Sequence, residues 1–173
     1  MTPVLTTPRL SLRPRRPEDA AALFPTMSDP VAMRWWSHAP VASVAELHDR
    51  FAQDSVGWRR WIVTRTGEDH AIGLVGAGEK RQGGVSEIGY LIACDAGGRG
   101  YAREAVAAVV DRLFAEGQRR VCADTDPDNI ASNHLLEALG FRREGLLRDE
   151  WETHIGVRDS VIWGLLRGDW RRG

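Results

Sequence analysis

A glycine turn joins a strand-like run to an amphipathic helix in the middle of the chain. Gly98 and Gly100 lie in this turn, and the helix that follows extends to about Glu116. Because glycine has no Cβ, the backbone of such a turn can approach a ligand closely, and the free N–H groups of the first helical turn point at its oxygens. Arg99 and Arg103 add positive charge at the same end. The turn therefore predicts a site for a polyphosphate.

Length and composition predict one cytoplasmic domain. The chain has 173 residues and a hydrophobic content of 43%, enough to bury a continuous core, so we expect residues 1–173 to form one domain. Cys94 and Cys122 form no C-x-x-C pair, and no run of about 18 apolar residues occurs, which is typical of a reduced cytoplasmic protein. The formal net charge of −1 provides no general attraction to nucleic acid or to an anionic membrane, so we expect neither as a partner.

Hydrophobic spacing and turn residues predict an alternation of strands and helices. Strands are predicted over residues 9–13, 58–66, 71–77, 85–93, 121–124, 141–147 and 156–166. Helices are predicted over residues 20–27, 33–36, 44–51, 100–116 and 130–139. The polar stretch from Asp149 to His154 is expected to connect the last two strands. This order predicts an α/β (α+β) fold in which the strands before the glycine turn pair antiparallel.

Two better-known phosphate-binding turns do not match this sequence. A dinucleotide-binding G-x-G-x-x-G turn needs a third glycine, but Arg103 occupies that position after Gly98. A P-loop needs lysine followed by serine or threonine, whereas the only lysine, Lys80, precedes Arg81. The polyphosphate is therefore expected to belong to another kind of ligand.

The segment Gly97–Ala102 resembles the pyrophosphate-binding loop of the GNAT superfamily of acetyl-CoA-dependent N-acyltransferases. That loop reads Q/R-x-x-G-x-G/A, and this chain matches it except at the first position, which is Gly97. Other segments resemble, in the same order, the branch that contains the ribosomal-protein N-terminal acetyltransferases. These segments are Thr7–Pro14, Glu87–Tyr90, Asn129–Asn133, Leu139–Gly145 and Gly156–Ser160.

The resemblance implies a GNAT fold that uses acetyl-CoA as co-substrate. Such a fold has a mixed, mostly antiparallel sheet of about six to seven strands flanked by helices, with the fourth and fifth strands splayed apart around the pantetheine arm. The residues that the resemblance assigns to acetyl-CoA are Tyr90, Leu91, Ile92, Gly97, Gly98, Arg99, Gly100, Tyr101, Ala102, Arg103, Asn129 and Ser132. Gly97 removes one side-chain contact but leaves the backbone donors. No metal is expected, because the five histidines are scattered without ligand spacing.

Glu87 and Ser132 are the candidates for proton transfer. Amine acylation needs a neutral nucleophile, so we expect Glu87, in an alternating strand near the splay, to act as the base; a solvent-facing strand glutamate is the alternative. Many GNAT enzymes protonate the CoA thiolate with a tyrosine on the helix after the fifth strand, but Leu136 occupies that position. Ser132, one helical turn after Asn129, is the candidate donor, directly or through water; the alternative is a small residue that lets CoA pass.

Tryptophans and acidic residues are the candidates for the acceptor side. The resemblance places Trp35 and Trp36 in a helical insert over the acceptor cleft, and adjacent tryptophans cannot both face one side of a helix. Glu87, in its strand, is expected to contact the acceptor as well. Trp151 lies in the last polar connection, where acidic neighbours suit a cationic amine; core packing and a solvated acidic turn are the alternatives. The resulting hypothesis is acetyl transfer to a primary amine, on a protein N-terminus or a small molecule. The alternative is a non-catalytic CoA-binding sensor. Under either hypothesis, a homodimer is one option for the assembly of the protein.

Overall fold

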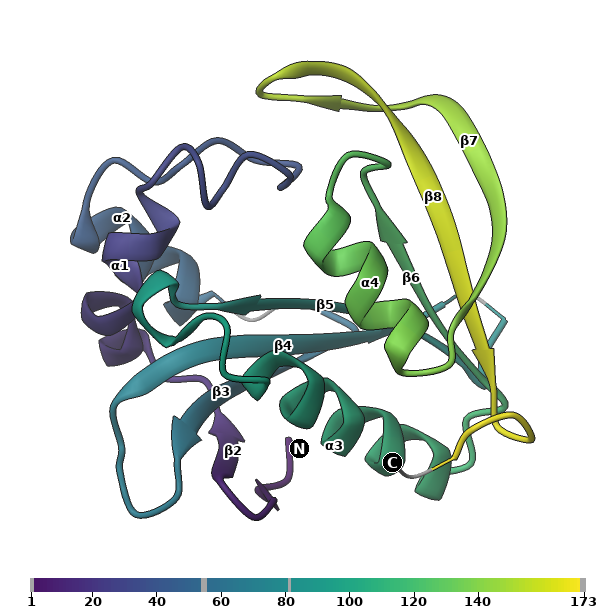
Figure 1. Ribbon diagram of the computed structural model, residues 1–173. Coiled ribbons are helices and arrows are strands. Elements are labelled where there is room, and N and C mark those ends of the chain that lie inside the picture. The colour runs from purple at the N-terminus through teal and green to yellow at the C-terminus, as the bar shows by residue number, and fades with distance from the viewer. Residues whose placement is uncertain (1, 54–55, 81, 172–173) are drawn as a thin grey trace.

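An eight-stranded sheet forms the centre of the computed structural model, which describes residues 2–53, 56–80 and 82–171 (Figure 1). The strands are β1 (Leu5–Thr6), β2 (Leu10–Pro14), β3 (Trp58–Arg65), β4 (Ala71–Glu79), β5 (Val85–Ile92), β6 (Arg120–Thr125), β7 (Arg142–Thr153) and β8 (Gly156–Leu166). The helices are α1 (Ala20–Met27), α2 (Val44–Ala52), α3 (Tyr101–Ala115) and α4 (Ile130–Ala138), with short 3-10 turns at Pro17–Asp19 and Cys94–Ala96. Across the sheet the strand order is β1-β2-β3-β4-β5-β6-β8-β7. None of the helices in this part of the chain has both the length and the apolar composition needed to span a bilayer.

The predicted mixed sheet with splayed strands is confirmed. Neighbouring strands pair antiparallel except β5 and β6, which are parallel because α3 carries the chain back across the sheet between them. The parallel pairing is confined to Val85–Glu87 against Arg120–Cys122. Beyond these residues β5 and β6 diverge and leave a gap in the sheet, which we call the β5–β6 gap.

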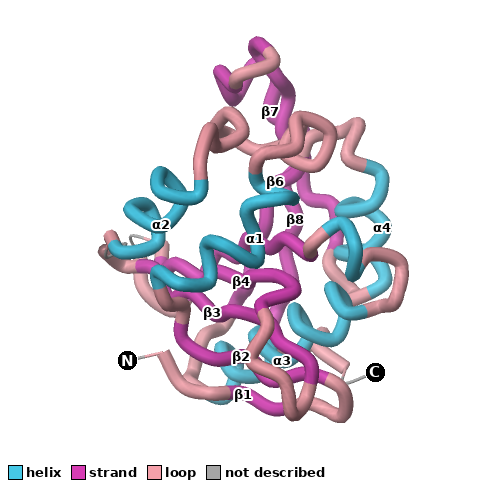
Figure 2. The backbone as a smooth tube through the Cα atoms, turned by 90° about the vertical axis from the view of Figure 1, so that its left-hand side faces the viewer, coloured by secondary structure: helices cyan, strands magenta, loops and turns pink. Residues whose placement is uncertain are grey.

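Different helices cover the two faces of the sheet. Side chains alternate along β5, so Ile88 and Tyr90 point to one face and Glu87 points to the other. Arg59 of β3 is paired with Ala77 of β4, which is paired with Ile88 of β5, so the side chains of Arg59 and Ile88 lie on the same face. Arg59 forms an ion pair of 2.7 Å with Glu116 at the end of α3. We therefore call the side of Tyr90 the α3 face. The side of Glu87 is the α1 face, where Figures 1 and 2 show α1 and α2 over the sheet.

The predicted helical faces supply much of the core. The buried residues of α3 recur at helical spacing: Ala105, Val106, Val109, Val110, Leu113 and Phe114. In α2 the Ser43 hydroxyl accepts a hydrogen bond of 3.1 Å from the Glu46 N–H, as an N-cap does, and Leu47 and Phe51 are buried. Periodicity and caps therefore locate both helices correctly.

The predicted helix from Met33 to Trp36 is wrong, because this segment forms successive turns instead. The Met33 N–H donates to the Asp29 carbonyl at 2.9 Å, and the Trp36 N–H donates to the Met33 carbonyl at 3.0 Å. The Asp29 carboxylate accepts from the Val31 N–H at 2.7 Å, so it caps a turn. Of these residues only Met33 is fully buried. A segment anchored by one side chain has no apolar stripe to stabilise a helix.

The polar stretch from Asp149 to His154 is also corrected, since most of it belongs to β7. This strand pairs with β8 as far as Thr153 opposite Gly156, with a register shift between Leu147 and Trp151. Neither face of β7 is buried, so its residues show no alternation, and backbone hydrogen bonds to β8 maintain its strand conformation. Figure 1 shows the resulting β7–β8 hairpin extending beyond the body of the sheet. With β1, which the sequence pattern does not reveal, the described residues form eight strands instead of six to seven.

Candidate active site

The glycine turn has the backbone conformation that a phosphate-binding loop requires. Gly98 (φ 72°) and Gly100 (φ 76°) adopt the left-handed conformation that favours glycine. Gly100 is the N-cap of α3, so the N–H groups of the first helical turn point out of the helix without acceptors inside it. Gly97 has an ordinary φ of −62°, so this departure from the family loop removes only a side chain. Arg99 and Arg103 are exposed beside the turn.

Arg9 of the N-terminal segment supports the turn and was missed by the sequence analysis. Its guanidinium lies 5.0 Å from the Tyr101 ring centre and donates to the Arg99 carbonyl at 3.0 Å. It also donates to the Glu104 carboxylate at 2.6 Å. Burial disfavours that carboxylate, but hydrogen bonds from Thr7 and Arg9 outweigh it and lower the pKa of Glu104. The signal was the segment Thr7–Pro14, which was recognised as a motif without a role.

On the α3 face, Tyr90 and Ser132 are hydrogen-bonded across the β5–β6 gap. Their hydroxyl oxygens are 2.6 Å apart. Ser132 lies in the first turn of α4, where its N–H donates to the Asn129 side chain at 3.2 Å, so Asn129 is the N-cap. Burial raises the pKa of Tyr90 to about 12, although the hydrogen bond with Ser132 opposes the shift. Tyr90 is therefore protonated at neutral pH and can donate to the serine.

The backbone of β5 is open toward the same gap. Pairing with β6 ends at Glu87, whereas pairing with β4 continues to Ile92. In the part of the chain that the structure describes, the N–H and C=O groups of Tyr90, Leu91 and Ile92 that point toward β6 therefore have no strand partner. A strand edge of this kind can accept an extended ligand as an additional strand.

Glu87 lies on the α1 face, where β5 and β6 begin to separate. Its side chain is 21% exposed and forms an ion pair with Lys80. This hydrogen-bonded carboxylate raises the pKa of Lys80. Cys122 is the register partner of Glu87 on β6, and burial, with the nearby negative charge, raises the pKa of its thiol. The structure therefore places a half-buried carboxylate at the edge of the gap.

Trp35 and Trp151 lie in one cluster at the outer end of β6, but Trp36 does not. The Trp151 indole donates to the Asp124 carboxylate at 2.8 Å, and Trp151 is the register partner of Arg158. The Arg158 guanidinium lies 5.7 Å from the Trp35 ring centre. Trp36 instead packs on the core, so the two adjacent tryptophans point to different surroundings. Asp124 and Arg158 are members of this cluster that the sequence analysis missed.

The predicted proton-transfer residues lie on opposite faces of the sheet, and both border the β5–β6 gap. Ser132 and Tyr90 approach the gap from the α3 face, on the side of the glycine turn and α4. Glu87 approaches it from the α1 face. A molecule threaded through the gap would therefore contact the serine with one part and the carboxylate with another.

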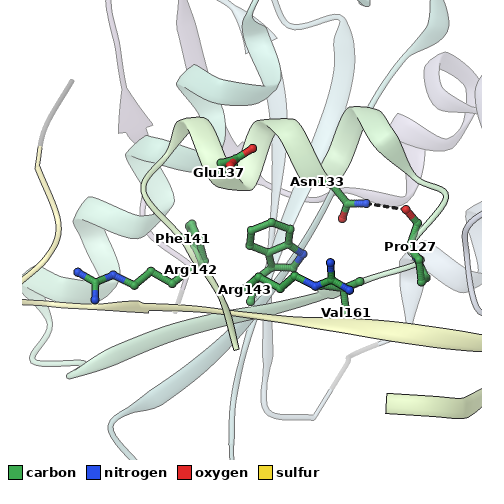
Figure 3. Close-up of a pocket in the computed structure, with 8 residues that line it drawn as sticks. Pro127, Asn133, Glu137, Phe141, Arg142, Arg143 and Val161 are labelled. Carbon is green, nitrogen blue, oxygen red and sulfur yellow. Dashed lines mark hydrogen bonds between the residues drawn. The ribbon is translucent and has the colours of Figure 1, made fainter. Parts of the chain in front are cut away.

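A separate pocket of about 550 Å³ lies between α4 and β8 (Figure 3). Its lining consists of Pro127, Asn133, Glu137, Phe141, Arg142, Arg143, Val161 and Trp163. Asn133 and Glu137 are rotated by roughly 100° to 140° around α4 from Ser132, so they face away from the gap. This pocket is therefore distinct from the candidate site. Among residues 2–53, 56–80 and 82–171, no group of three or more His, Cys, Asp or Glu side chains is placed to hold a metal ion.

Comparison with protein families matches residues 9–142 to the acetyltransferase (GNAT) domain. Among curated proteins, the uncharacterized N-acetyltransferase YoaA of Bacillus subtilis is 35% identical over 178 residues, covering 96% of this chain and 98% of that protein. The [ribosomal protein uS5]-alanine N-acetyltransferase of Escherichia coli is 34% identical over 88 residues, covering 50% of this chain and 45% of that enzyme.

Solved structures share the fold. A GNAT-family acetyltransferase from Bacillus anthracis superposes with a TM-score of 0.87 at 22% identity, covering 96% of this chain and 99% of that one. RimJ of Mycobacterium smegmatis, in complex with CoA-disulfide, superposes with a TM-score of 0.82 at 24% identity, covering 99% of this chain and 89% of that one. The overall fold of this chain is therefore that of known acetyltransferase structures.

Proposed function

Since this chain belongs to the GNAT family and is an N-acetyltransferase, we propose that it transfers the acetyl group of acetyl-CoA directly to a primary amine, first of all a protein N-terminus. A small-molecule amine is the second candidate acceptor. The observation that carries the proposal is the β5–β6 gap, which is bordered by the Glu87 carboxylate on the α1 face and by the Tyr90 and Ser132 hydroxyl groups on the α3 face. The similarity to an enzyme that acetylates a ribosomal protein favours the protein acceptor.

GNAT acetyltransferases use acetyl-CoA, and the residues around the gap fit this co-substrate. The left-handed conformations of Gly98 and Gly100 and the free N–H groups at the start of α3 suit the pyrophosphate. Arg99 and Arg103 lie close enough to add charge at the same end. The unpaired edge of β5 beyond Glu87 suits the amide groups of the pantetheine arm. Acetyl-CoA then supplies an acyl group already activated as a thioester.

Glu87 accepts the proton that the acceptor amine must lose. A primary amine is mostly an ammonium ion at neutral pH, and only its neutral form attacks a carbonyl. The Glu87 carboxylate already binds one ammonium group, that of Lys80, so it has the charge and exposure to bind another. An acceptor ammonium displaces Lys80 from the carboxylate and transfers its proton there, directly or through one water.

Ser132 and Tyr90 protonate the sulfur of the leaving group. Ser132 is held by the N-cap of α4 and by the hydroxyl of Tyr90, which lies 2.6 Å away. As Ser132 donates its proton, Tyr90 can replace it along this hydrogen bond, so the negative charge moves to a phenol and not to an alcohol. The pair therefore takes the role that Leu136 cannot take at the usual tyrosine position.

A combined binding and turnover measurement tests the proposal. Calorimetric titration with acetyl-CoA measures co-substrate binding, and thiol release measures transfer to a panel of peptides and small amines, with mass spectrometry locating the acetyl group. We expect binding together with N-acetylated product on at least one amine class. Tight binding without turnover on any amine would contradict the proposal and favour a CoA-binding sensor.

A further inference from the structure

Arg60 is a half-buried cation on the α1 face that has no counter-ion. Its guanidinium stacks on the Trp58 ring, 4.5 Å from the ring centre. No carboxylate or hydrogen-bond acceptor pairs with this guanidinium anywhere in the described ranges of the chain. Burial lowers the pKa of Arg60, and the nearby charge of Arg15 lowers it further. A cation in such surroundings gains free energy when an anion binds beside it.

Several other arginines on the strands and their connections have acidic partners. The ion pairs include Arg9–Glu104, Arg13–Asp19, Arg59–Glu116, Arg120–Glu144 and Arg158–Asp126. The contrast is sharpest within β3, where Arg59 points to the α3 face and is neutralised, while the next residue points to the α1 face and is not. Arg60 therefore differs from Arg59, its neighbour in the same strand, in carrying an uncompensated charge on the face where Glu87 lies.

Three glycines give Arg60 its position and leave room beside it. A Cβ on Gly76 would lie 2.2 Å from the Arg60 guanidinium, and a Cβ on Gly78 would lie 2.3 Å from the Trp58 ring. Both side chains therefore lie flat over glycines of β4. On β5, Gly89 is the register partner of Gly76, and nothing lies within 4 Å of the point where a Cβ on Gly89 would be. Open space thus adjoins the guanidinium on the same face as Glu87.

We infer that Arg60 selects the acceptor by binding a carboxylate that lies close to the amine to be acetylated. This inference rests on the proposed function, because it places the acceptor amine at Glu87. With strands about 4.8 Å apart and about 3.4 Å of rise per residue, Gly76 and Glu87 are separated by roughly 8 Å along the diagonal. An acceptor that spans them carries its amine and carboxylate a few bonds apart.

Two sources of this chemistry fit the separation. One is a peptide N-terminus with an acidic side chain in its first two residues, and the other is a free amino acid with an acidic side chain. In both, the carboxylate forms charge-assisted hydrogen bonds with Arg60 while the ammonium group lies at the Glu87 carboxylate. Together Arg60 and Glu87 recognise an acceptor with both charges, which explains why cation and carboxylate share one face without pairing with each other.

Matched acceptors and matched variants test the inference. The acceptors are C-terminally amidated peptides with Glu or Gln as the second residue, and glutamate against glutamine as their α-amides. In each pair only the acidic member carries a carboxylate near the amine, and the two sources are measured separately. In the wild type we expect kcat/KM to favour the acidic member of at least one pair by roughly 10- to 100-fold. Arg60→Met should collapse this ratio toward one, mainly through KM, and Arg60→Lys should restore part of it. Arg59→Met, which alters the neighbouring residue on the opposite face, should keep the full ratio.

The outcomes separate the inference from the function on which it rests. If amines are acetylated but the wild type shows no preference for the acidic member of either pair, the role of Arg60 is wrong and the acetyltransferase proposal stands. A preference that survives in Arg60→Met also overturns that role. If no amine is acetylated although acetyl-CoA binds, the result contradicts the proposed function, and with it the inference that depends on it. Binding of acetyl-CoA by Arg60→Met with wild-type affinity shows that the variant is folded.

Discussion

At residue scale, the chemistry of the site depends on two pairs of side chains. Lys80 and Glu87 form an ion pair on the α1 face, and Tyr90 and Ser132 share a hydrogen bond on the α3 face. Glu87 and Ser132 were expected from the sequence as proton-transfer residues, and Tyr90 as a contact of acetyl-CoA; the ion pair with Lys80 and the hydroxyl pair with Tyr90 were not expected. The partners matter because they decide what each group can do: Lys80 must be displaced before an amine reaches Glu87, and Tyr90 can supply the proton that Ser132 gives away.

Glu87→Gln removes the base and retains the size of the side chain. If Glu87 accepts the acceptor proton, kcat/KM should fall about 100-fold or more, while the affinity for acetyl-CoA stays close to that of the wild type. Steady-state thiol release and calorimetry measure the two quantities. Lys80→Met is the matched control, because it removes the other half of the ion pair and keeps the carboxylate. Equal losses in both variants would show that the ion pair matters only for structure.

The raised pKa of Tyr90 predicts that the folded protein loses stability at alkaline pH. Its pKa is raised from 10.0 to about 12 by burial, so between these pH values the folded protein keeps a proton that the unfolded chain has lost. The free energy of unfolding should therefore fall as the pH rises through this window, by about 2 to 3 kcal/mol from this group. Urea unfolding of the wild type and Tyr90→Phe across the window checks this, because the variant lacks the contribution. Parallel declines in the two proteins would contradict it.

At the scale of elements, the junction between β5 and α3 provides the anion site. The 3-10 turn at Cys94–Ala96 ends the strand, and Gly98 and Gly100 turn the chain so that α3 starts with its N–H groups exposed. Arg9 reaches this junction from the segment before β2 and binds the Arg99 carbonyl. The loop is therefore held by contacts with another element and not only by its own glycines.

Gly100→Ala tests whether the left-handed N-cap matters for ligand binding. An alanine with φ near 76° is strained, which should lower stability by about 1 to 2 kcal/mol and weaken acetyl-CoA binding by roughly tenfold or more. Gly97→Ala is the control, since its φ of −62° is acceptable for any residue. Thermal unfolding and calorimetric titration of both variants give the comparison. If acetyl-CoA binds Gly100→Ala as tightly as Gly97→Ala, the turn does not position the phosphates.

At the scale of the whole molecule, one buried arginine joins three parts of the chain. Arg13 of β2 is 8% exposed and binds both oxygens of Asp19, at 2.9 and 2.6 Å. It also pairs with Asp69 in the turn between β3 and β4, and this contact lowers the pKa of Asp69. The network connects the edge of the sheet to the start of α1, which in turn covers the α1 face.

Arg13→Met should destabilise the fold strongly, because it leaves the Asp19 carboxylate buried without a counter-ion. We expect a loss of about 3 to 5 kcal/mol in the free energy of unfolding. Arg16→Met is the control: Arg16 is exposed and pairs with the same Asp69 at 3.0 Å, so its loss should cost less than about 1 kcal/mol. Urea unfolding of the two variants measures both values, and similar small losses would show that the Arg13 network adds little.

Much of the fold could be predicted from the sequence, and the errors have physical causes. The spacing of Val106, Val109 and Leu113 located α3, and the glycine turn before it was identified in the right place. The segment near Met33 and the polar part of β7 were assigned incorrectly, because each is held by contacts that leave no periodic pattern. The gap was expected from the family resemblance, and no residue pattern in β5 or β6 would have revealed it.

Local patterns in the chain were enough to indicate a glycine turn suited to a polyphosphate, antiparallel strands before it and a glutamate in the strand that precedes it, because helix periodicity, strand alternation and glycines in turns can be read over a few residues. The partners of the candidate residues depend on folding, since Tyr90 and Ser132 are separated by 42 positions and meet through the divergence of β5 and β6. The same holds for Arg60, whose side chain is ordinary in the sequence. Its isolation from every acidic group in the described chain exists only because the sheet places it over Gly76, on the face opposite Glu116.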